Sequence, residues 1–190
     1  HYMRPWLALF PVSGCIAWMA SSVFHTKKNR ITVPTDYATA LFLLSYCVWL
    51  AARRVWGKNA NPWAVGAVFV AGLGLTTHQA VRIYQGVVPF QSHLLVCSVI
   101  AALQAAIWVL WGLLAPRRDA RLGYHCVVLQ VWFGLAAMLE IFDFPPVLGH
   151  FDAHSLWHAA TVPLGFAWYR FWRLDTNGEQ DHGGVRCKED

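Results

Sequence analysis

Apolar residues fall in six long runs along the chain, at residues 6–24, 37–55, 63–83, 93–114, 124–142 and 153–171. Each run approaches the roughly 20 apolar residues that a helix needs to cross the hydrocarbon core of a bilayer. Short connections rich in Lys, Arg, Asn, Asp, Gly and Pro separate the runs. The pattern predicts an all-α fold, a polytopic membrane helix bundle with six transmembrane helices in this chain.

The domain organisation follows from where the apolar pattern stops. No internal repeat or low-complexity segment divides the chain. We therefore assign residues 1–175 to one transmembrane domain and residues 176–190 to a polar cytoplasmic tail. The chain begins with His1 and shows no signal peptide, so we expect that a further N-terminal part precedes it.

Composition and charge narrow the class of protein. Hydrophobic residues make up 57% of the chain and charged residues only 13%, whereas a soluble domain carries about a quarter charged residues. The net charge of +5 raises the possibility of nucleic-acid binding. The basic residues, however, cluster at the ends of apolar runs, where they determine membrane topology. We therefore exclude nucleic acid as a partner and expect the bilayer instead.

The distribution of basic residues predicts the orientation of the helices. With six alternating helices, eleven of the 15 Lys and Arg residues lie on the side that holds both ends of the chain. That side is expected to be cytoplasmic, because cytoplasmic loops carry an excess of Lys and Arg. The opposite side then faces the lumen. Lys27, Lys28 and Arg30 lie on this lumenal side and are an exception to the rule.

Several polar residues gather at the predicted lumenal side. Ser21 and His25 are four residues apart at the end of the first run, and Asp36 opens the second. His154 and His158 are again four apart, in the first turns of the sixth run. Residues at this spacing share one face of a helix. Ionisable groups at membrane depth are costly, so this cluster indicates a functional site.

The cluster has the composition of a catalytic zinc site. His154 and His158 can chelate one ion, and His25 supplies a third nitrogen, which leaves the fourth position open for water. Asp36 can act as general base toward that water. Ser21 can hydrogen-bond the water or a developing oxyanion. A single histidine near a helix end is more often an interfacial residue, so the hypothesis depends on the combination.

Three further carboxylates lie near the same side. Glu140 and Asp143 end the fifth run and either orient ligand histidines, as outer carboxylates do, or lie among the lipid headgroups. Asp152 precedes the sixth run and is interpreted first as its N-cap, with the orienting role as the alternative. His93 is assigned to the membrane interface.

In combination and order, these motifs resemble the Per-like family of post-GPI-attachment membrane hydrolases, in the CREST superfamily. The resemblance rests on S-x-x-x-H at residues 21–25, Asp36-Tyr37, F-D-F-P-P at 142–146 and D-A-H-S-L-W-H at 152–158. It extends from about residue 6 to about residue 173. Members carry a cysteine-rich lumenal region and one more transmembrane helix before the segment seen here, so seven helices are expected in the full protein.

The resemblance implies a function as well as a fold. Members are regarded as GPI-specific phospholipases A2 that remove the sn-2 acyl chain from the lipid of GPI-anchored proteins. It implies Zn2+ held by His25, His154 and His158, with Asp36 and Ser21 activating water. It also implies a multi-pass protein of the endoplasmic reticulum or Golgi membrane, whose active site faces the lumen and whose partners are GPI-anchored proteins and their lipid.

Three other functions use similar residues. An alkaline ceramidase, in the same superfamily, cleaves an amide with the same set of groups. A receptor-like seven-helix protein of the superfamily keeps the zinc site without turnover. A haem-binding bundle also uses paired histidines, but its ligands are expected near both membrane surfaces, whereas those of this chain converge at one. The residues of the D-F-P-P and D-A-H-S-L-W-H motifs resemble the Per-like branch in particular, which favours hydrolysis of a GPI lipid.

Overall fold

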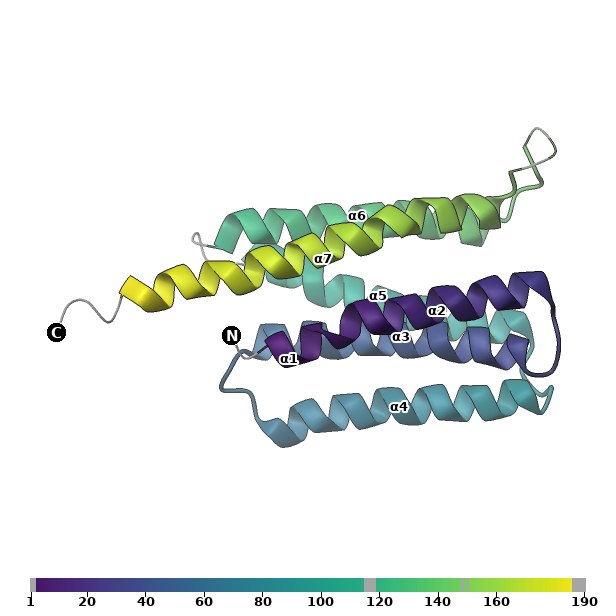
Figure 1. Ribbon diagram of the computed structural model, residues 1–190, viewed down its shortest axis with the longest axis horizontal. Helices are drawn as coiled ribbons and strands as arrows, with labels where there is room; N and C mark the ends of the chain where they lie inside the picture. The colour runs from purple at the N-terminus through teal and green to yellow at the C-terminus, as the bar shows by residue number, and fades with distance from the viewer. Residues whose placement is uncertain (1–2, 115–118, 148, 150, 186–190) are drawn as a thin grey trace. The chain divides into compact units, whose positions relative to one another are not determined.

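The computed structural model describes residues 3–114, 119–147, 149 and 151–185. These residues form the helices α1 (Arg4–Leu7), α2 (Leu9–Thr26), α3 (Thr32–Trp56), α4 (Pro62–Tyr84), α5 (Phe90–Leu114), α6 (Ala120–Phe142) and α7 (Ala153–Val185) (Figure 1). Within the described residues, the β-structure consists of an isolated bridge between Val147 and Phe151. The prediction of an all-α membrane helix bundle is confirmed.

Five helical segments are long and apolar enough to cross a membrane: Pro5–Thr26, Thr32–Trp56, Pro62–Tyr84, Phe90–Leu114 and Ala120–Phe142. Their large apolar side chains are often exposed, as at Leu95 and Leu135, which is expected where a helix faces lipid. The sixth predicted span, 153–171, lies inside α7, which is not among these five segments of the described residues. Helical structure in α7 continues through Val185, into the predicted tail, and residues 186–190 lie outside the described residues.

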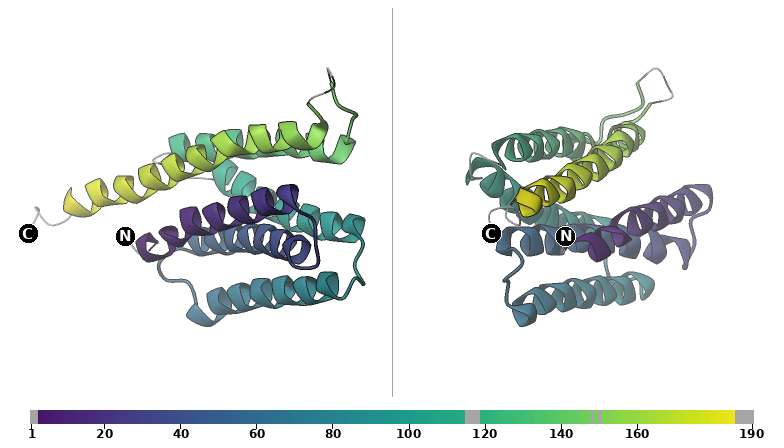
Figure 2. Two further views of the ribbon diagram at one scale, coloured as in Figure 1. Left: turned by 45° about the vertical axis from the view of Figure 1, so that its right-hand side comes forward. Right: turned by 60° about the vertical axis from the view of Figure 1, so that its left-hand side comes forward.

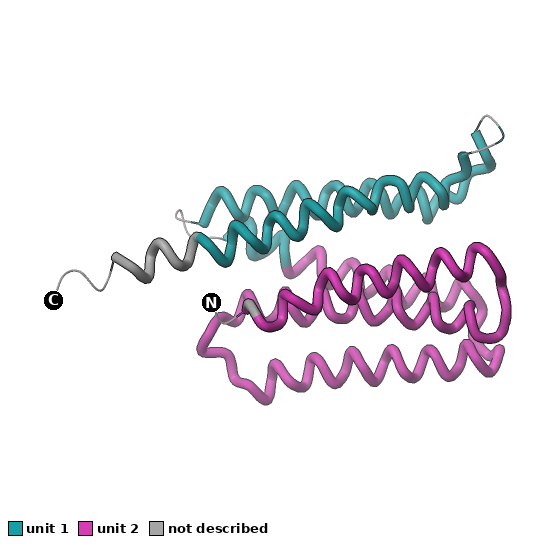
Figure 3. Tube along the Cα trace, in the orientation of Figure 1, with its two compact units in different colours: residues 1, 108–190 teal, residues 2–107 magenta. Residues whose placement is uncertain are grey.

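The chain divides into two compact units (Figure 3). The N-terminal unit, residues 2–107, is drawn in magenta, and the C-terminal unit, from residue 108 onward, is drawn in teal. The boundary falls inside α5, between Ile107 and Trp108. Each unit is described by itself below.

In the N-terminal unit, α3 packs against both α2 and α4 (Figure 2). Its buried side chains include Leu41, Ser45 and Trp49. The Trp49 indole N–H donates to the carbonyl of Val65 on α4 at 3.0 Å. At Gly72 an added Cβ would lie 3.0 Å from the Cβ of Ser45. The small residues therefore allow α3 and α4 to approach closely, as is common between membrane helices.

In the C-terminal unit, α6 and α7 are joined by residues 143–152 and pack along their length. The end of α5 joins them through a close contact, because a Cβ at Gly112 would lie only 2.7 Å from the carbonyl oxygen of Gly123. Trp108 is 1% exposed and is packed against Trp168 and Phe171. This aromatic cluster joins the end of α5 to α7, far along the chain from the first turns of α7 that carry His154 and His158.

Candidate functional site

Asp152 starts α7 and thereby sets the direction of its first turns. Its Oδ1 accepts a hydrogen bond from the backbone N–H of Ser155 at 2.7 Å, which is the geometry of an N-cap. The Ser155 hydroxyl donates in return to the Asp152 carbonyl at 2.9 Å. The backbone hydrogen bond stabilises the charged form and lowers the pKa of the Asp152 carboxyl. The first turn that carries His154 is therefore held by the loop residue before it.

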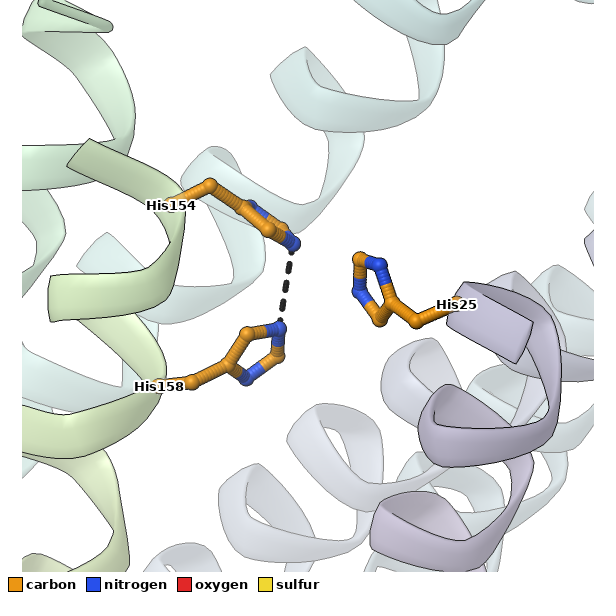
Figure 4. Close-up of side chains that lie close together, drawn as sticks. All are labelled: His25, His154 and His158. Atoms are coloured by element: carbon orange, nitrogen blue, oxygen red, sulfur yellow. Dashed lines mark hydrogen bonds between the residues drawn. The ribbon is translucent and has the colours of Figure 1, made fainter. Parts of the chain in front are cut away.

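His154 and His158 lie on the same face of α7, one turn apart (Figure 4). Their Nε2 atoms are 3.0 Å apart, and the two rings are nearly perpendicular, with centroids separated by 4.5 Å. Neither side chain is fully buried. The pair thus presents two ring nitrogens toward one point at the start of α7.

Glu140, in the last turn of α6, fixes the orientation of His154. Its Oε2 lies 2.7 Å from Nδ1 of His154, so the Nδ1–H donates to the carboxylate. That tautomer leaves a lone pair on Nε2 of His154, and the Nε2–H of His158 then donates to it. Because its other nitrogen is engaged, His154 presents Nε2 as its ligand atom, as metal-binding histidines with a carboxylate partner do.

The His154 and His158 pair fits the requirements of a zinc ion. Zn–N bonds of about 2.0–2.1 Å in tetrahedral geometry place two ligand nitrogens roughly 3.3 Å apart. The Nε2 atoms are 3.0 Å apart, so a small rotation of one ring is enough for chelation. A change of tautomer that moves the His158 proton from Nε2 to Nδ1 would leave a lone pair on both Nε2 atoms for the ion. The two histidines could therefore share a metal ion, and their role as zinc ligands stays a prediction.

The N-terminal unit positions the other predicted residues at one end of its helices. Ser21 and His25 lie in the last two turns of α2, and the His25 side chain, labelled in Figure 4, is exposed. Asp36 lies in the second turn of α3 and is half-buried. The five residues 27–31 join the two helices, so the three side chains belong to the same end of this unit. Phe24 packs edge-on against His25, with centroids 5.0 Å apart.

Asp143 occupies the C-cap of α6 in the left-handed conformation, with φ of 39°. Aspartate tolerates this conformation better than most residues with a side chain. The Asp143 side chain is exposed. The helix ends at this residue, and Pro145 and Pro146 follow two and three residues later. Its predicted role as an orienting carboxylate stays a prediction.

His93, which was assigned from the sequence to the membrane interface, lies in the first turn of α5 and is buried. It is 5% exposed, and its ring is stacked on Tyr37 with centroids 4.5 Å apart and an angle of 7°. Its Nε2 lies 3.4 Å from Sγ of Cys97. The reason is helix rotation: the first turn of α5 turns His93 toward α3, and apolarity along one helix does not reveal that rotation. The spacing of four residues between His93 and Cys97 was the sequence feature that could have indicated this contact.

Comparison with known proteins decides the family. The model of the Per1-like family matches residues 1–176. The chain belongs to the Per1-like family. The resemblance seen in the motifs is thereby confirmed, and no solved structure matches the chain.

Curated relatives carry names that refer to GPI. A Xenopus laevis protein named GPI-specific phospholipase A2-like PGAP3 is 30% identical over 171 residues, which cover 88% of this chain and 52% of the relative. The Homo sapiens protein of the same name is 32% identical, with 84% and 49% covered. The Drosophila melanogaster protein named post-GPI attachment to proteins factor 3 is 27% identical, with 85% and 49% covered. The chain thus spans about half the length of the curated relatives it matches.

Proposed function

We propose that this Per1-like protein is a zinc-dependent hydrolase that removes the sn-2 acyl chain from the lipid of GPI-anchored proteins. The observation that carries the proposal is the trio of Glu140, His154 and His158, in which a carboxylate fixes a histidine pair 3.0 Å apart. The names of the relatives, which refer to GPI and to phospholipase A2, support the choice of substrate.

His25, His154 and His158 are the proposed zinc ligands. Each of the three offers a ring nitrogen as a ligand atom. Three protein nitrogens leave the fourth position of a tetrahedral ion for water or substrate, as in catalytic rather than structural sites. Zinc in such a site lowers the pKa of a bound water to about 7 and polarises a carbonyl oxygen.

Asp36 and Ser21 are the proposed catalytic side chains. Asp36 accepts a proton as water attacks the sn-2 ester carbonyl, and later returns it to the departing glycerol oxygen. Ser21, which shares a face of α2 with His25, donates a hydrogen bond to the developing oxyanion. Glu140 keeps His154 in the tautomer that binds metal. The carboxylic acid and the lyso-lipid are the products.

The cellular setting belongs to the same proposal. The excess of basic residues on the side of the chain ends supports a lumenal active site. GPI-anchored proteins reside on the lumenal face of secretory membranes, so the substrate and the site share one side. The proposed location is the endoplasmic reticulum or Golgi membrane.

The test is mass spectrometry of GPI lipids in cells that lack their own family member. The protein and its His158→Ala variant are expressed, with His125→Ala as the matched control, since His125 is half-buried and its Nδ1 lies 2.7 Å from the Arg121 carbonyl oxygen in the preceding turn of the same helix. The proposal predicts sn-2 deacylation with the protein and the control but not with His158→Ala. Hydrolysis of ceramide in place of GPI lipid, or equal activity of all three forms, would refute it.

A further inference from the structure

The loop between α2 and α3 carries an uncompensated positive charge. Lys27, Lys28 and Arg30 lie within four residues, and all three side chains are exposed. Among the residues that the structure describes, none of the three forms an ion pair. The first acidic residue after them in the chain is Asp36, already on α3. The loop therefore presents three cations whose charge no carboxylate of the described residues neutralises.

Membrane topology does not account for these cations. The loop lies on the side with the minority of basic residues, and the positive-inside rule disfavours Lys and Arg there. If Lys27, Lys28 and Arg30 were neutral, Arg82 alone would remain on that side and the orientation signal would be stronger. Their presence calls for a different role.

The backbone of the loop is fixed by side-chain hydrogen bonds. Oδ1 of Asn29 accepts from the N–H groups of Ile31 at 2.8 Å and Thr32 at 2.9 Å. The Thr32 hydroxyl donates to the Lys27 carbonyl at 2.6 Å and accepts from the Asn29 N–H at 3.0 Å. These bonds close the turn on itself. The cations are consequently displayed from a defined backbone rather than from a free linker.

The charged loop is directly attached to the proposed catalytic end of α2. Lys27 follows His25 by two residues and is the C-cap of the helix. The Lys28 ammonium lies 5.1 Å from the centre of the Phe24 ring, within cation–π range. Phe24 in turn packs against His25. An anion held by the loop would thus lie beside the proposed ligand His25.

We infer that Lys27, Lys28 and Arg30 bind the phosphodiester of the lipid substrate. The inference rests on the proposed function and specifies its substrate. In a diacyl phospholipid the phosphate is attached to the glycerol carbon next to the one that carries the sn-2 ester, so a few bonds separate the anion from the scissile carbonyl. Lysine and arginine are the side chains that recognise phosphate by charge-assisted hydrogen bonds. Ceramide has no phosphate, so the loop selects a phospholipid over ceramide.

The test is lipid binding by the full chain in uncharged maltoside micelles that contain no phosphate. The His158→Ala background prevents turnover, so binding is measured separately from catalysis. Phosphatidylinositol and diacylglycerol with identical acyl chains are compared. The triple variant Lys27→Gln, Lys28→Gln and Arg30→Gln is expected to weaken phosphatidylinositol binding about tenfold or more and to leave diacylglycerol binding within about twofold. Added salt should weaken phosphatidylinositol binding to the parent but hardly affect the triple variant.

Arg82→Gln is the matched control, because Arg82 is an exposed cation of the same unit and lies on the same predicted side. It should leave binding of both lipids unchanged. Equal weakening of both lipids by the triple variant, no weakening at all, or an equal effect of Arg82→Gln would each overturn the inference. If cells show no GPI deacylation while selective phosphatidylinositol binding persists, the proposed hydrolase activity fails and this inference stands.

Discussion

Nδ1 of His154 lies 2.7 Å from Oε2 of Glu140, which ties the start of α7 to the end of α6. The Glu140 side chain is 17% exposed, so the bond is shielded from much of the solvent. This one contact gives His154 a defined tautomer and directs its Nε2 toward His158. The contact therefore holds in place one of the two histidines that are proposed to bind zinc.

Replacing Glu140 by Gln should lower zinc affinity. The amide is nearly isosteric but carries no charge, so His154 loses its preferred tautomer and some basicity. Loss of such an orienting carboxylate typically costs about 10–100-fold in metal affinity. Competition with a chromogenic chelator measures the change. A fall of this size in Asp143→Asn but not in Glu140→Gln would instead identify Asp143 as the orienting residue.

Replacing Asp36 by Asn should remove activity but not zinc. If Asp36 is the general base, its loss lowers kcat by about 10²–10⁴-fold. The three histidines would still hold the ion, so the zinc content should stay at the parental level. Deacylation of a phospholipid in micelles and elemental analysis of the same sample provide the two readouts. Loss of zinc together with activity would make Asp36 a ligand, contrary to its proposed role.

The sequence predicts features that depend on the spacing of residues along a single helix. The i, i+4 spacing of His154 and His158 is enough to place them on one face of a helix, and the six apolar runs are enough to place most helices. Helix ends extend past the apolar runs, as at Thr32 and Phe90, because helical hydrogen bonding continues through polar residues at the interface.

Contacts between residues on different helices could not be predicted from the sequence. Glu140 and Asp143 were equivalent candidates for orienting a histidine, and Asp152 was interpreted first as an N-cap, since the choice of the orienting carboxylate depends on the rotation of α6 against α7. The structure gives Glu140 this contact and gives Asp152 a capping bond. The burial of His93 against Tyr37 depends in the same way on the rotation of α5. Sequence patterns along one helix contain no information on that angle.

Asp152→Ala should lower the melting temperature of the metal-free protein at neutral pH, because the Ser155 N–H loses its acceptor. Asp152→Asn keeps an oxygen acceptor and is the control, with a smaller loss expected. The hydrogen bond lowers the pKa of Asp152 in the folded state. Its extra stabilisation is therefore present above the unfolded pKa of about 4 and is lost as the pH falls through the lower folded pKa.

The pH dependence can be checked by thermal unfolding in detergent. The difference between the parent and Asp152→Ala should shrink as the pH is lowered below about 4. A difference that grows on acidification would mean that the carboxylate is not stabilised in the folded state.

Gly112→Ala should destabilise the C-terminal unit. The new Cβ would lie 2.7 Å from the carbonyl oxygen of Gly123, and backbone atoms cannot move aside as a flexible side chain can. Overpacking of this kind costs about 1–3 kcal/mol. Gly134→Ala is the control, because nothing lies within 4 Å of a Cβ at that position. Unfolding in detergent measures both, and equal stability of the two variants would argue against the close contact between α5 and α6.

Zinc binding by the purified chain and its single-histidine variants tests the central claim most directly. Elemental analysis and chelator competition would be applied to the parent, His25→Ala, His154→Ala and His158→Ala, with His125→Ala as control. The account predicts one zinc ion per parent chain, at least a tenfold loss of affinity in each of the three variants, and no loss in the control. A parent that binds no zinc, or a His25→Ala variant with parental affinity, would contradict it.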